Sequence, residues 1–472
     1  MMLPTYYLSI DLGATSGRTI IASYDGKRIN MRELTRFENP QIHRDGHVYW
    51  DMPHLYNEIL VALQQVKAEG IELASIGIDT WGCDVAFFDR NGELVGLPYC
   101  YRNPHTDGVM ERYFAECMPQ QELYERTGIQ FMPFNTLFQL DTIRRNSKEM
   151  FSRADKILFM PDALIYMLTG EAVMEQTVAS TSQMLNLQTG DLDTKILASI
   201  GLSREHFGRL VSPGERVGVL NRKVQEMTGL GPVSVVAVGS HDTASAVAAV
   251  PAEDGNYAYL SCGTWSLLGI ESPVSIINNN SLNHNFTNEG GLDGTIRFLK
   301  NITGLWLLEQ CRKEWTEGQV PSDVNELNAL SLISSCQSLI NPDDPRFAHS
   351  DSMTAAIRDY LIETEQPLPQ CPADYVRIIF RSLANRYAEV VEILRNISPV
   401  DIQRLHVIGG GSRNEYLMQF AADTLHMPVI AGPQEGTALG NALVQVRAAG
   451  LVGSLAEMRG IVERSIELKH YI

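Results

Sequence analysis

The side chains of residues 10–18, IDLGATSGR, suit the binding of a phosphate group. The two glycines let backbone N–H groups turn toward an anion, Thr15 and Ser16 add hydroxyl donors, and Arg18 adds positive charge. Asp11 can hold hydrated Mg²⁺. A polar hairpin turn is the alternative interpretation. The phosphate site is favoured because Asp11 lies at the end of an apolar run, where a carboxylate is usually paired or liganded.

A second candidate is Asp242, in the sequence GSHDTA at residues 239–244. The apolar run 233–238 before it predicts a strand, and small residues that suit a helix follow. An open α/β sheet binds ligands at the carboxyl ends of its strands, which makes Asp242 a candidate general base. The alternative is an N-cap aspartate that accepts hydrogen bonds from helix N–H groups. His241 by itself is more typical of a packed, hydrogen-bonded histidine than of a catalyst.

Three further segments could contact a ligand. Gly263 and Thr264 repeat the Gly-Thr chemistry of the first turn and could bind the other side of a phosphate chain. The glycines at 409–411 could lie against an adenosine or form a plain strand-to-helix connection. Residues 79–84 could line a sugar through Trp81, which could equally fill the core. P-loop, dinucleotide-binding, zinc and α/β-hydrolase motifs are absent from the sequence.

The hydrophobic pattern predicts the elements that position these candidates. Three β-forming runs joined by short turns predict strands at 6–12, 18–24 and 28–37. A helix is expected from a cap at Asp51 to a stop at Gly70. A buried strand at 75–79 and a hairpin turn at 89–92 follow.

The second half of the chain repeats this opening scheme. The predicted elements are strands at 257–260 and 265–270 around a Gly-Thr turn, helices at 303–315 and 375–396, and a strand-turn-helix unit at 405–426. The repeat indicates internal duplication. We expect two lobes, residues 1–245 and 246–472, that share a closing cleft, and a surface loop at 278–288.

Composition excludes several classes of partner. The 472 residues carry 38 Lys and Arg against 56 Asp and Glu, and the net charge of −18 disfavours nucleic acid and anionic membranes. Seven cysteines, an odd number with no C-x-x-C pair, favour a reduced, cytoplasmic compartment. Neither a basic N-terminal region nor an 18-residue apolar run is present, so we predict no export signal and no membrane span.

Seven motifs, spread in order over nearly the whole chain, resemble those of the FGGY family of carbohydrate kinases. They are IDLGATSGR at 10–18, GIDTWG at 77–82, FNTLFQ at 134–139, GSHDT at 239–243, CGTWSL at 262–267, NITGLW at 301–306 and GGGSRN at 409–414. The resemblance implies an α/β fold of two ribonuclease-H-like lobes, as in actin-like ATPases, related by duplication and separated by a cleft.

The same resemblance implies roles for individual residues. The nucleotide-binding candidates are Ala14, Thr15, Ser16, Gly17, Arg18, Thr264, Glu309 and Gly410, and the metal candidate is Asp11. The substrate-binding candidates are Gly82, His241, Asp242, Thr243 and Asn301, with Asp242 also the proton acceptor. Glu309 occupies a position where relatives often have Gln. Phe420 and Thr424 occupy positions where some relatives have a cysteine pair, so no disulfide is expected there.

The resemblance implies that Asp242 deprotonates the 1-hydroxyl of a ketose as that oxygen attacks the γ-phosphoryl group of ATP, with Mg²⁺ present. The motifs match best those members that phosphorylate L-rhamnulose in L-rhamnose catabolism. Kinases for fuculose, xylulose or glycerol remain alternatives. A non-kinase actin-like ATPase and a sugar-binding regulator without catalysis are alternatives from other classes. The expected partner is a small-molecule ketose, and the expected assembly is a monomer or homodimer.

Overall fold

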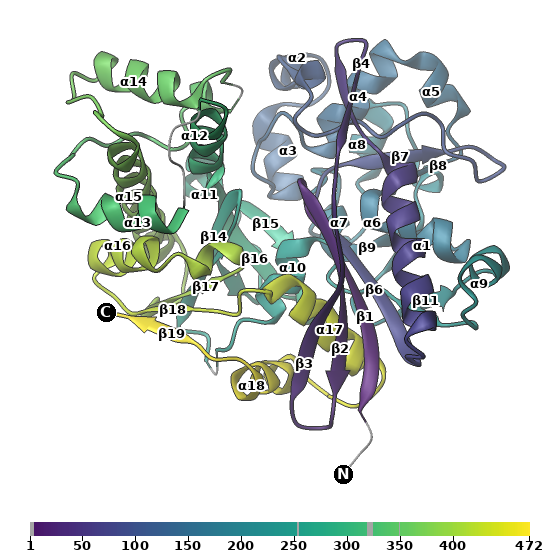
Figure 1. Cartoon of the computed structure of the whole chain (residues 1–472). Coiled ribbons are helices and arrows are strands. Elements are labelled where there is room, and N and C mark those ends of the chain that lie inside the picture. Colours follow the sequence, from purple (N-terminus) through teal and green to yellow (C-terminus); the bar gives the residue numbers. More distant parts are fainter. Residues whose placement is uncertain (1–3, 253, 319–323, 349) are drawn as a thin grey trace. The chain divides into compact units, whose positions relative to one another are not determined.

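The computed structural model describes residues 4–252, 254–318, 324–348 and 350–472, which form two compact units (Figure 1). Of these residues, the first unit contains 4–252, 271–298 and 436–465, and the second contains the others. The first unit is therefore assembled from three separate stretches of the chain. All seven cysteines lie within the described residues and are free thiols.

The first unit is built on a six-stranded sheet with the order β11-β12-β6-β1-β2-β3. Its strands are β1 (Thr5–Leu12), β2 (Ser16–Tyr24), β3 (Ile29–Glu38), β6 (Leu73–Thr80), β11 (Arg216–Val219) and β12 (Ser234–Val236). Strands β1, β2 and β3 form an antiparallel meander, and β6 pairs in parallel with both β1 and β12. The structure confirms the three N-terminal strands and the buried strand predicted after the first helix.

A seven-stranded sheet has the order β15-β16-β14-β13-β17-β18-β19. Its strands are β13 (Tyr257–Cys262), β14 (Trp265–Ser272), β15 (Thr287–Gly290), β16 (Ile296–Thr303), β17 (Arg404–Ile408), β18 (Val429–Ala431) and β19 (Lys469–Tyr471). Strand β13 pairs antiparallel with β14 and parallel with β17, as β1 does with β2 and β6. An antiparallel edge strand then follows a parallel one in each sheet. This repeated order is the topology that the predicted duplication requires.

The remaining strands and the helices surround these sheets (Figure 1). The first unit adds β4 (Gln41–Arg44), β5 (His47–Trp50), β7 (Val85–Phe88), β8 (Lys156–Phe159), β9 (Val173–Glu175), β10 (Arg209–Val211), α1 (Met52–Ala68), α2 (Val109–Glu116), α3 (Gln120–Thr127), α4 (Thr136–Asn146), α5 (Lys148–Arg153), α6 (Met160–Thr169), α7 (Gln176–Ser180), α8 (Thr194–Ser199), α9 (Arg222–Thr228), α10 (Asp242–Ala248), α11 (Asn279–Asn283), α17 (Gly436–Ala448) and α18 (Leu455–Ser465). The helices of the second unit are α12 (Trp306–Glu317), α13 (Val324–Ile333), α14 (Met353–Glu363), α15 (Pro372–Ile397) and α16 (Glu415–Leu425).

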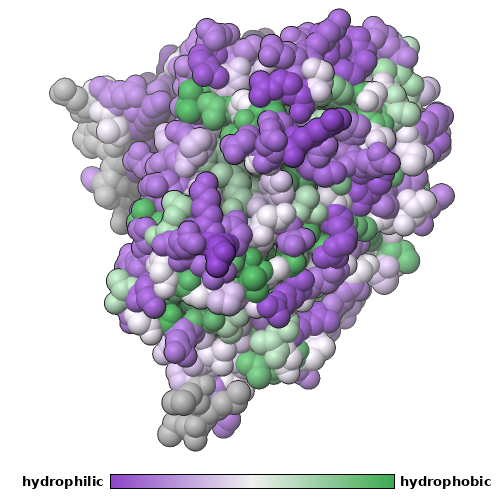
Figure 2. All heavy atoms as spheres, turned by 90° about the vertical axis from the view of Figure 1, so that its right-hand side faces the viewer, coloured by the Kyte–Doolittle hydropathy of each residue, from purple (hydrophilic) through white to green (hydrophobic). Residues whose placement is uncertain are grey.

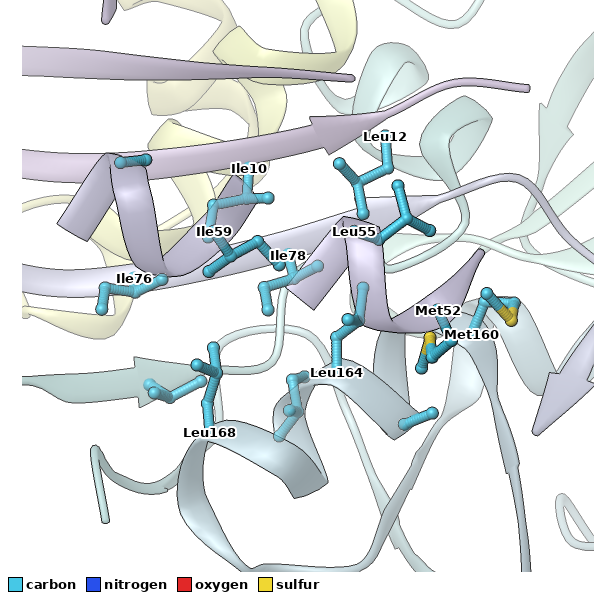
Figure 3. Close-up of a cluster of buried hydrophobic side chains, with 14 of the residues drawn as sticks. Ile10, Leu12, Met52, Leu55, Ile59, Ile76, Ile78, Met160, Leu164 and Leu168 are labelled. Carbon is cyan, nitrogen blue, oxygen red and sulfur yellow. The ribbon is translucent and has the colours of Figure 1, made fainter. Parts of the chain in front are cut away.

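Apolar and polar side chains alternate along the central strands of the first sheet, which gives the sheet one apolar face and one polar face. Ile10 on β1 and Ile76 and Ile78 on β6 pack with Leu55 on α1 and Leu164 on α6 in one buried cluster (Figure 3). Because side chains of a strand point alternately to opposite faces, the residues between them face the other way. Helix α1 begins at the predicted cap, since Asp51 accepts a hydrogen bond from the His54 N–H at 3.0 Å.

Helix α17 packs on the polar face of the same sheet. Ser9 donates a hydrogen bond to the Ala438 carbonyl at 3.1 Å, and Ser75 donates one to Gln445 at 2.8 Å. Gly77 permits this close approach, because a Cβ there would lie 2.5 Å from Oδ1 of Asn441. Side chains of β1 and β6 that are polar or small therefore face α17, and Asp11 and Asp79 belong to this set by their alternation.

Two sequence predictions are wrong in detail. Residues 278–288 are not a surface loop, because they contain α11 and the start of β15, and Phe286 and Asn288 are fully buried. The predicted helix at 303–315 begins only at Trp306, because Thr303 still belongs to β16.

Hydrophilic side chains cover most of the face of the molecule in Figure 2, and hydrophobic ones form scattered groups there. The described chain contains no helix with the length and apolar character needed to span a membrane.

Candidate functional site

Three aspartates of the first unit gather at one edge of its sheet. Asp11 and Asp79 are register partners in the parallel strands β1 and β6. Thr80 pairs in parallel with His241, and the Thr80 N–H donates to the Ser240 carbonyl at 2.9 Å. Asp242 follows directly and begins α10. The carboxyl ends of neighbouring parallel strands thus bring these side chains together, as expected for a ligand site in an α/β sheet.

The ends of β1 and β2 that flank the turn between them are held by an ion pair between Asp11 and Arg18 and by the packing of Gly17 against Phe37. Arg18, the register partner of Asp11, contacts Oδ2 of Asp11 through Nη2 at 2.8 Å and Nε at 3.1 Å. Gly17 leaves no room for a side chain, since a Cβ would collide with the ring of Phe37. Thr15 at the tip is exposed, and Ala14 and Ser16 are half-buried. The hydroxyl and N–H donors of the predicted phosphate turn lie at an accessible loop.

Asp79 is a functional candidate that sequence reasoning did not identify. It is fully buried, and its Oδ2 accepts a hydrogen bond from Nδ2 of Asn441 at 2.5 Å. Oδ1 of Asp79 has no hydrogen-bond partner among the described residues. Burial raises the pKa of Asp79 well above its usual value, and the charges of Asp11 and Asp242 raise it further, against the opposing effect of Asn441. Burial and the neighbouring carboxylates thus make Asp79 a weaker acid than an aspartate in water.

The backbone before Asp242 is held by a buried carboxylate. Oε2 of Glu175 accepts hydrogen bonds from the Ser240 N–H at 3.1 Å and from Oγ1 of Thr177 at 2.5 Å, and that hydroxyl accepts one from the His241 N–H at 3.2 Å. Burial raises the pKa of Glu175 to about 7, although these donors favour its ionised form. The loop that carries Asp242 thus has a fixed backbone.

Asp242 is the first residue of α10 rather than its N-cap, a position that His241 occupies. The N-cap alternative for Asp242 is therefore wrong. The Asp242 side chain is 33% exposed, and its Oδ1 accepts a hydrogen bond from Oγ1 of the buried Thr243 at 3.0 Å. Nε2 of His241 lies 3.5 Å from the same oxygen. A solvent-accessible carboxylate held on one oxygen is suited to accept a proton on the other.

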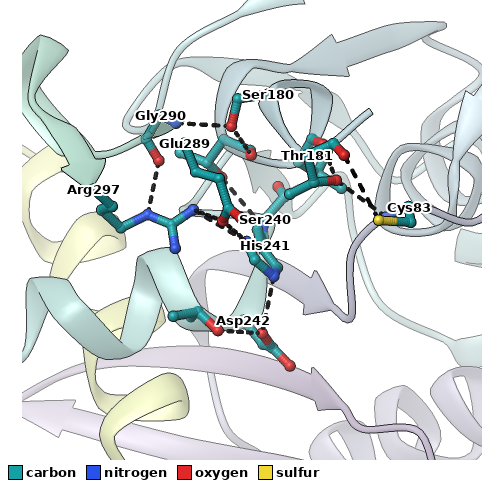
Figure 4. A network of polar contacts seen from close by, with 12 residues as sticks. Cys83, Ser180, Thr181, Ser240, His241, Asp242, Glu289, Gly290 and Arg297 are labelled. Atoms are coloured by element: carbon teal, nitrogen blue, oxygen red, sulfur yellow. Dashed lines mark hydrogen bonds and ion pairs between the residues drawn. The ribbon is translucent and has the colours of Figure 1, made fainter. Parts of the chain in front are cut away.

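His241 is the packed, hydrogen-bonded histidine that its sequence context suggested (Figure 4). Its Nδ1 lies 3.1 Å from Nη2 of Arg297 and 3.3 Å from Oε2 of Glu289. Arg297 is fully buried and forms an ion pair of 3.1 Å with Glu289. Burial of Glu289 opposes its ionisation, but the positive charge of Arg297 outweighs that effect and lowers the pKa of Glu289.

A second buried carboxylate, Asp84, organises the segment that contains Gly82. It accepts hydrogen bonds from the indole N–H groups of Trp50 at 2.6 Å and Trp81 at 2.9 Å, and from Gln139 at 2.8 Å. Burial raises the pKa of Asp84 to about 6 despite these donors. Trp81 is only 6% exposed, so it fills the core, and half-buried Gly82 is the accessible member of this segment.

The other candidates belong to the second unit. Half-buried Thr264 lies in the turn between β13 and β14, and its carbonyl accepts hydrogen bonds from the N–H groups of Gly304 at 3.1 Å and Trp306 at 3.2 Å. Half-buried Asn301 lies on β16, and exposed Glu309 lies in the first turn of α12. Exposed Gly410 has open space around its Cβ position.

The glycine turn after β17 packs against the end of β13. Gly409 has φ +86°, which favours glycine, and a Cβ there would lie 3.1 Å from the Cys262 carbonyl. A Cβ at Gly411 would collide with Sγ of Cys262. Two of the three glycines are thus required by packing, and only Gly410 presents bare backbone to solvent.

The residues that sequence reasoning missed are Asp79, Asp84, Glu175, Glu289, Arg297 and Asn441. Asp79 and Asp84 lay inside a segment that was considered for sugar binding, where a carboxylate in an apolar run is the available signal. Glu289 lay in the segment wrongly predicted as a surface loop. Glu175, Arg297 and Asn441 occur in no motif.

Two family models match the chain. The N-terminal domain of the FGGY family of carbohydrate kinases matches residues 6–249, and the C-terminal domain of the same family matches residues 258–449. These matches contain the aspartates of the first unit and the Gly-Thr turn of the second.

Curated proteins and solved structures agree with the family models. A rhamnulokinase of Bacteroides thetaiotaomicron is 50% identical over 98% of this chain and 95% of its own, and one of Pectobacterium carotovorum is 42% identical over 98% and 92%. A gluconate kinase from Lactobacillus acidophilus has a TM-score of 0.81 at 15% identity over 99% of this chain and 93% of its own. A Plasmodium falciparum glycerol kinase with ADP has a TM-score of 0.79 at 16% identity over 99% and 94%. The structural matches establish a shared fold.

Proposed function

This chain belongs to the FGGY family of carbohydrate kinases, and on that premise we propose that it transfers the γ-phosphoryl group of ATP to the 1-hydroxyl of L-rhamnulose. The observation that carries the choice of sugar is the 50% identity, over nearly the full length of both chains, to a rhamnulokinase. The product is L-rhamnulose 1-phosphate, and the reaction belongs to L-rhamnose catabolism.

Asp242 is the proposed general base. It takes the proton of the sugar 1-hydroxyl while that oxygen attacks the γ-phosphorus, and ADP leaves with the bridging oxygen. Its exposure of 33% and its place at the strand ends of the first sheet support this role. Gly82, His241, Thr243 and Asn301 are the proposed sugar contacts. Fixed positions matter here because most of the catalysis of phosphoryl transfer comes from positioning and electrostatic stabilisation.

The proposed nucleotide contacts are Ala14, Thr15, Ser16, Gly17, Arg18, Thr264, Glu309 and Gly410. The accessible turn between β1 and β2 supports this set, because its N–H and hydroxyl groups suit phosphate oxygens. In this arrangement residues 1–245 supply the base and most sugar contacts, and residues 246–472 supply the adenosine turn. Arg18 contributes positive charge near the phosphates.

Mg²⁺ is the proposed companion of ATP, and Asp11 is the residue that would hold it. A carboxylate oxygen suits this hard cation, and Mg²⁺ usually binds one or two carboxylates, water and phosphate oxygens. The described residues contain no group of three or more His, Cys, Asp or Glu side chains arranged for a metal ion. The bound cation would neutralise phosphate charge.

ADP release from ATP and Mg²⁺ across L-rhamnulose, L-fuculose, D-xylulose and glycerol tests the choice of substrate. We expect the highest kcat/KM for L-rhamnulose, with the product identified as the 1-phosphate by ³¹P and ¹³C NMR. A higher kcat/KM for another acceptor would overturn the substrate assignment. ATP turnover that is independent of every acceptor would overturn the kinase reaction itself. The Asp242→Asn variant supplies the background rate.

We propose the cytoplasm as the compartment, since ATP is present there and a reduced environment suits the seven free thiols. The proposed assembly is a monomer or homodimer, which sedimentation equilibrium at two protein concentrations distinguishes. A larger or heterogeneous assembly would contradict it.

A further inference from the structure

Behind the proposed base lies a buried ion pair that touches its neighbour His241. Arg297 and Glu289 are 0% and 5% exposed at their side chains, and both contact Nδ1 of His241 (Figure 4). An ion pair taken out of water gains little net stability. The Arg297–Glu289 ion pair contacts His241, the residue before Asp242, which points to a role at the proposed base.

The contacts at Nδ1 fix where the imidazole carries its proton. Nη2 of Arg297 forms a hydrogen bond with Nδ1 at 3.1 Å, whereas Oε2 of Glu289 has no contact of hydrogen-bond geometry in the described chain. A guanidinium N–H can only donate, so Nδ1 must accept. The proton of a neutral imidazole then lies on Nε2, which faces Oδ1 of Asp242 at 3.5 Å.

Helix α7 holds this arrangement in place from behind. Nε of Arg297 donates to the Gly290 carbonyl at 2.9 Å, and the Gly290 N–H donates to Oγ of Ser180 at 2.8 Å. The His241 N–H donates to Oγ1 of Thr177 at 3.2 Å, on the same short helix. The guanidinium of Arg297, through Gly290, and the backbone of His241 are thus both connected to α7, as the dashed lines of Figure 4 show in part.

We propose that Arg297 and Glu289 are positioning residues for the base: they hold His241 as the neutral Nε2–H tautomer, so that an N–H rather than a lone pair faces Oδ1 of Asp242 at 3.5 Å. This inference rests on the proposed role of Asp242. Thr243 donates a hydrogen bond to the same Oδ1 at 3.0 Å, while Oδ2 has no hydrogen bond among the described residues. Oδ2 is consequently the atom that receives the sugar proton. Glu289 neutralises the buried guanidinium and orients Nη2 through their 3.1 Å contact.

Two single variants make opposite predictions about the tautomer. In Glu289→Gln the Arg297 donor remains, so His241 stays protonated on Nε2. In Arg297→Met the donor is lost and a buried carboxylate remains 3.3 Å from Nδ1, so the proton moves to Nδ1. Long-range ¹H–¹⁵N NMR of ¹⁵N-histidine-labelled protein, free of ATP and sugar, reads each nitrogen directly. His241→Gln assigns the signal among the 11 histidines.

Kinetics then link the tautomer to the base. We expect kcat of Arg297→Met to fall about 10- to 100-fold, less than the roughly 10²- to 10⁴-fold loss on removing a general base, because Asp242 itself remains. The kcat of Glu289→Gln should fall less than that of Arg297→Met. Arg209→Met/Glu215→Gln, an exposed pair of 3.1 Å in the same unit, is the charge-matched control and should keep wild-type kcat. Circular dichroism checks folding. Arg297→Lys keeps an N–H donor and should retain the Nε2–H tautomer, and where Arg297→Met is unfolded, the tautomers of wild type and Arg297→Lys test the proposal.

Several outcomes would overturn the proposal. Wild-type His241 protonated on Nδ1, or doubly protonated at neutral pH, contradicts the assigned tautomer. An unchanged tautomer in Arg297→Met contradicts the role of Arg297, and a changed tautomer with wild-type kcat contradicts positioning of the base. The NMR result is obtained without substrates, so it stands apart from a failure of the proposed kinase reaction.

Discussion

Asn441 donates a 2.5 Å hydrogen bond from Nδ2 to Oδ2 of Asp79, a residue 362 positions earlier in the chain. The amide is also fixed from its own helix, because its Oδ1 accepts from Gln445 at 2.7 Å. One side chain of α17 therefore satisfies one oxygen of a buried carboxyl group at the edge of the first sheet, beside the proposed base.

Asn441→Ala should lower the free energy of unfolding by about 1–3 kcal/mol, because it leaves a second buried oxygen of Asp79 without a partner. Thermal unfolding followed by circular dichroism measures the change. Asn396→Ala, at an exposed position near the end of α15, is the matched control and should have little effect. Equal melting temperatures for Asn441→Ala and wild type would contradict the assigned hydrogen bond.

Asp242→Asn should retain sugar binding and lose about 10² to 10⁴ in kcat, since the amide cannot accept the hydroxyl proton. Isothermal titration with L-rhamnulose measures binding, and ADP release measures turnover. Asp401→Asn removes an exposed carboxylate of the second unit and serves as the control. Turnover of Asp242→Asn close to that of wild type would rule out the assignment of the base.

The buried Glu175 predicts a specific dependence of stability on pH. Its pKa is about 7 in the folded protein against an ordinary value of 4.5, so the folded state binds the proton more tightly. Its contribution to the free energy of unfolding therefore falls as pH rises from about 4.5 to 7, by up to about 3 kcal/mol.

Glu175→Gln should remove this contribution, so the stability difference between variant and wild type changes across that pH range. Urea unfolding at half-unit pH steps measures it, with Glu215→Gln, at an exposed side chain, as the control. Stability curves for wild type and Glu175→Gln that run parallel from pH 4.5 to 7 would show that Glu175 does not titrate in this way.

Gly440→Ala should destabilise the first unit by about 1–3 kcal/mol or more, because a Cβ there collides with the Ser245 carbonyl where α17 packs on α10. Gly231→Ala, where a Cβ meets nothing within 4 Å, should be neutral within about 0.5 kcal/mol. Melting temperatures compare the two. A tolerated alanine at Gly440 would mean that α10 and α17 are packed less closely than the structure shows.

Local patterns were enough to predict the elements that carry the site. The cap at Asp51, the β-runs around the first turn and the strand before Asp79 all depend on residues close in sequence, and the structure confirms them. The motif at residues 239–243 likewise predicted that Asp242 follows a strand, and the structure places it after β12 at the start of α10. The role of Asp242 as base stays a prediction.

The supporting residues could not be predicted because their partners are distant in sequence. Arg297 meets His241 and Asn441 meets Asp79 only in the folded chain. Residues 278–288 were predicted as a loop from their polar composition, but Asn288 bonds the Ile276 N–H at 2.6 Å and the Gly128 carbonyl at 3.0 Å. The sequence alone does not distinguish a buried asparagine that bonds backbone groups from an asparagine that is exposed to water, because both have the same donors and acceptors.

The return of α17 to the first sheet has a consequence for synthesis on the ribosome. Strands β1, β2, β3 and β6 emerge long before residues 436–465, so Ser75, Gly77 and Asp79 of the nascent polypeptide stay without their α17 partners until that helix has been synthesised. Domains usually fold one after another as they leave the ribosome. Here the first unit acquires its last stretch only after residues 299–435 of the second unit have been made, so the two units cannot complete their folding in chain order.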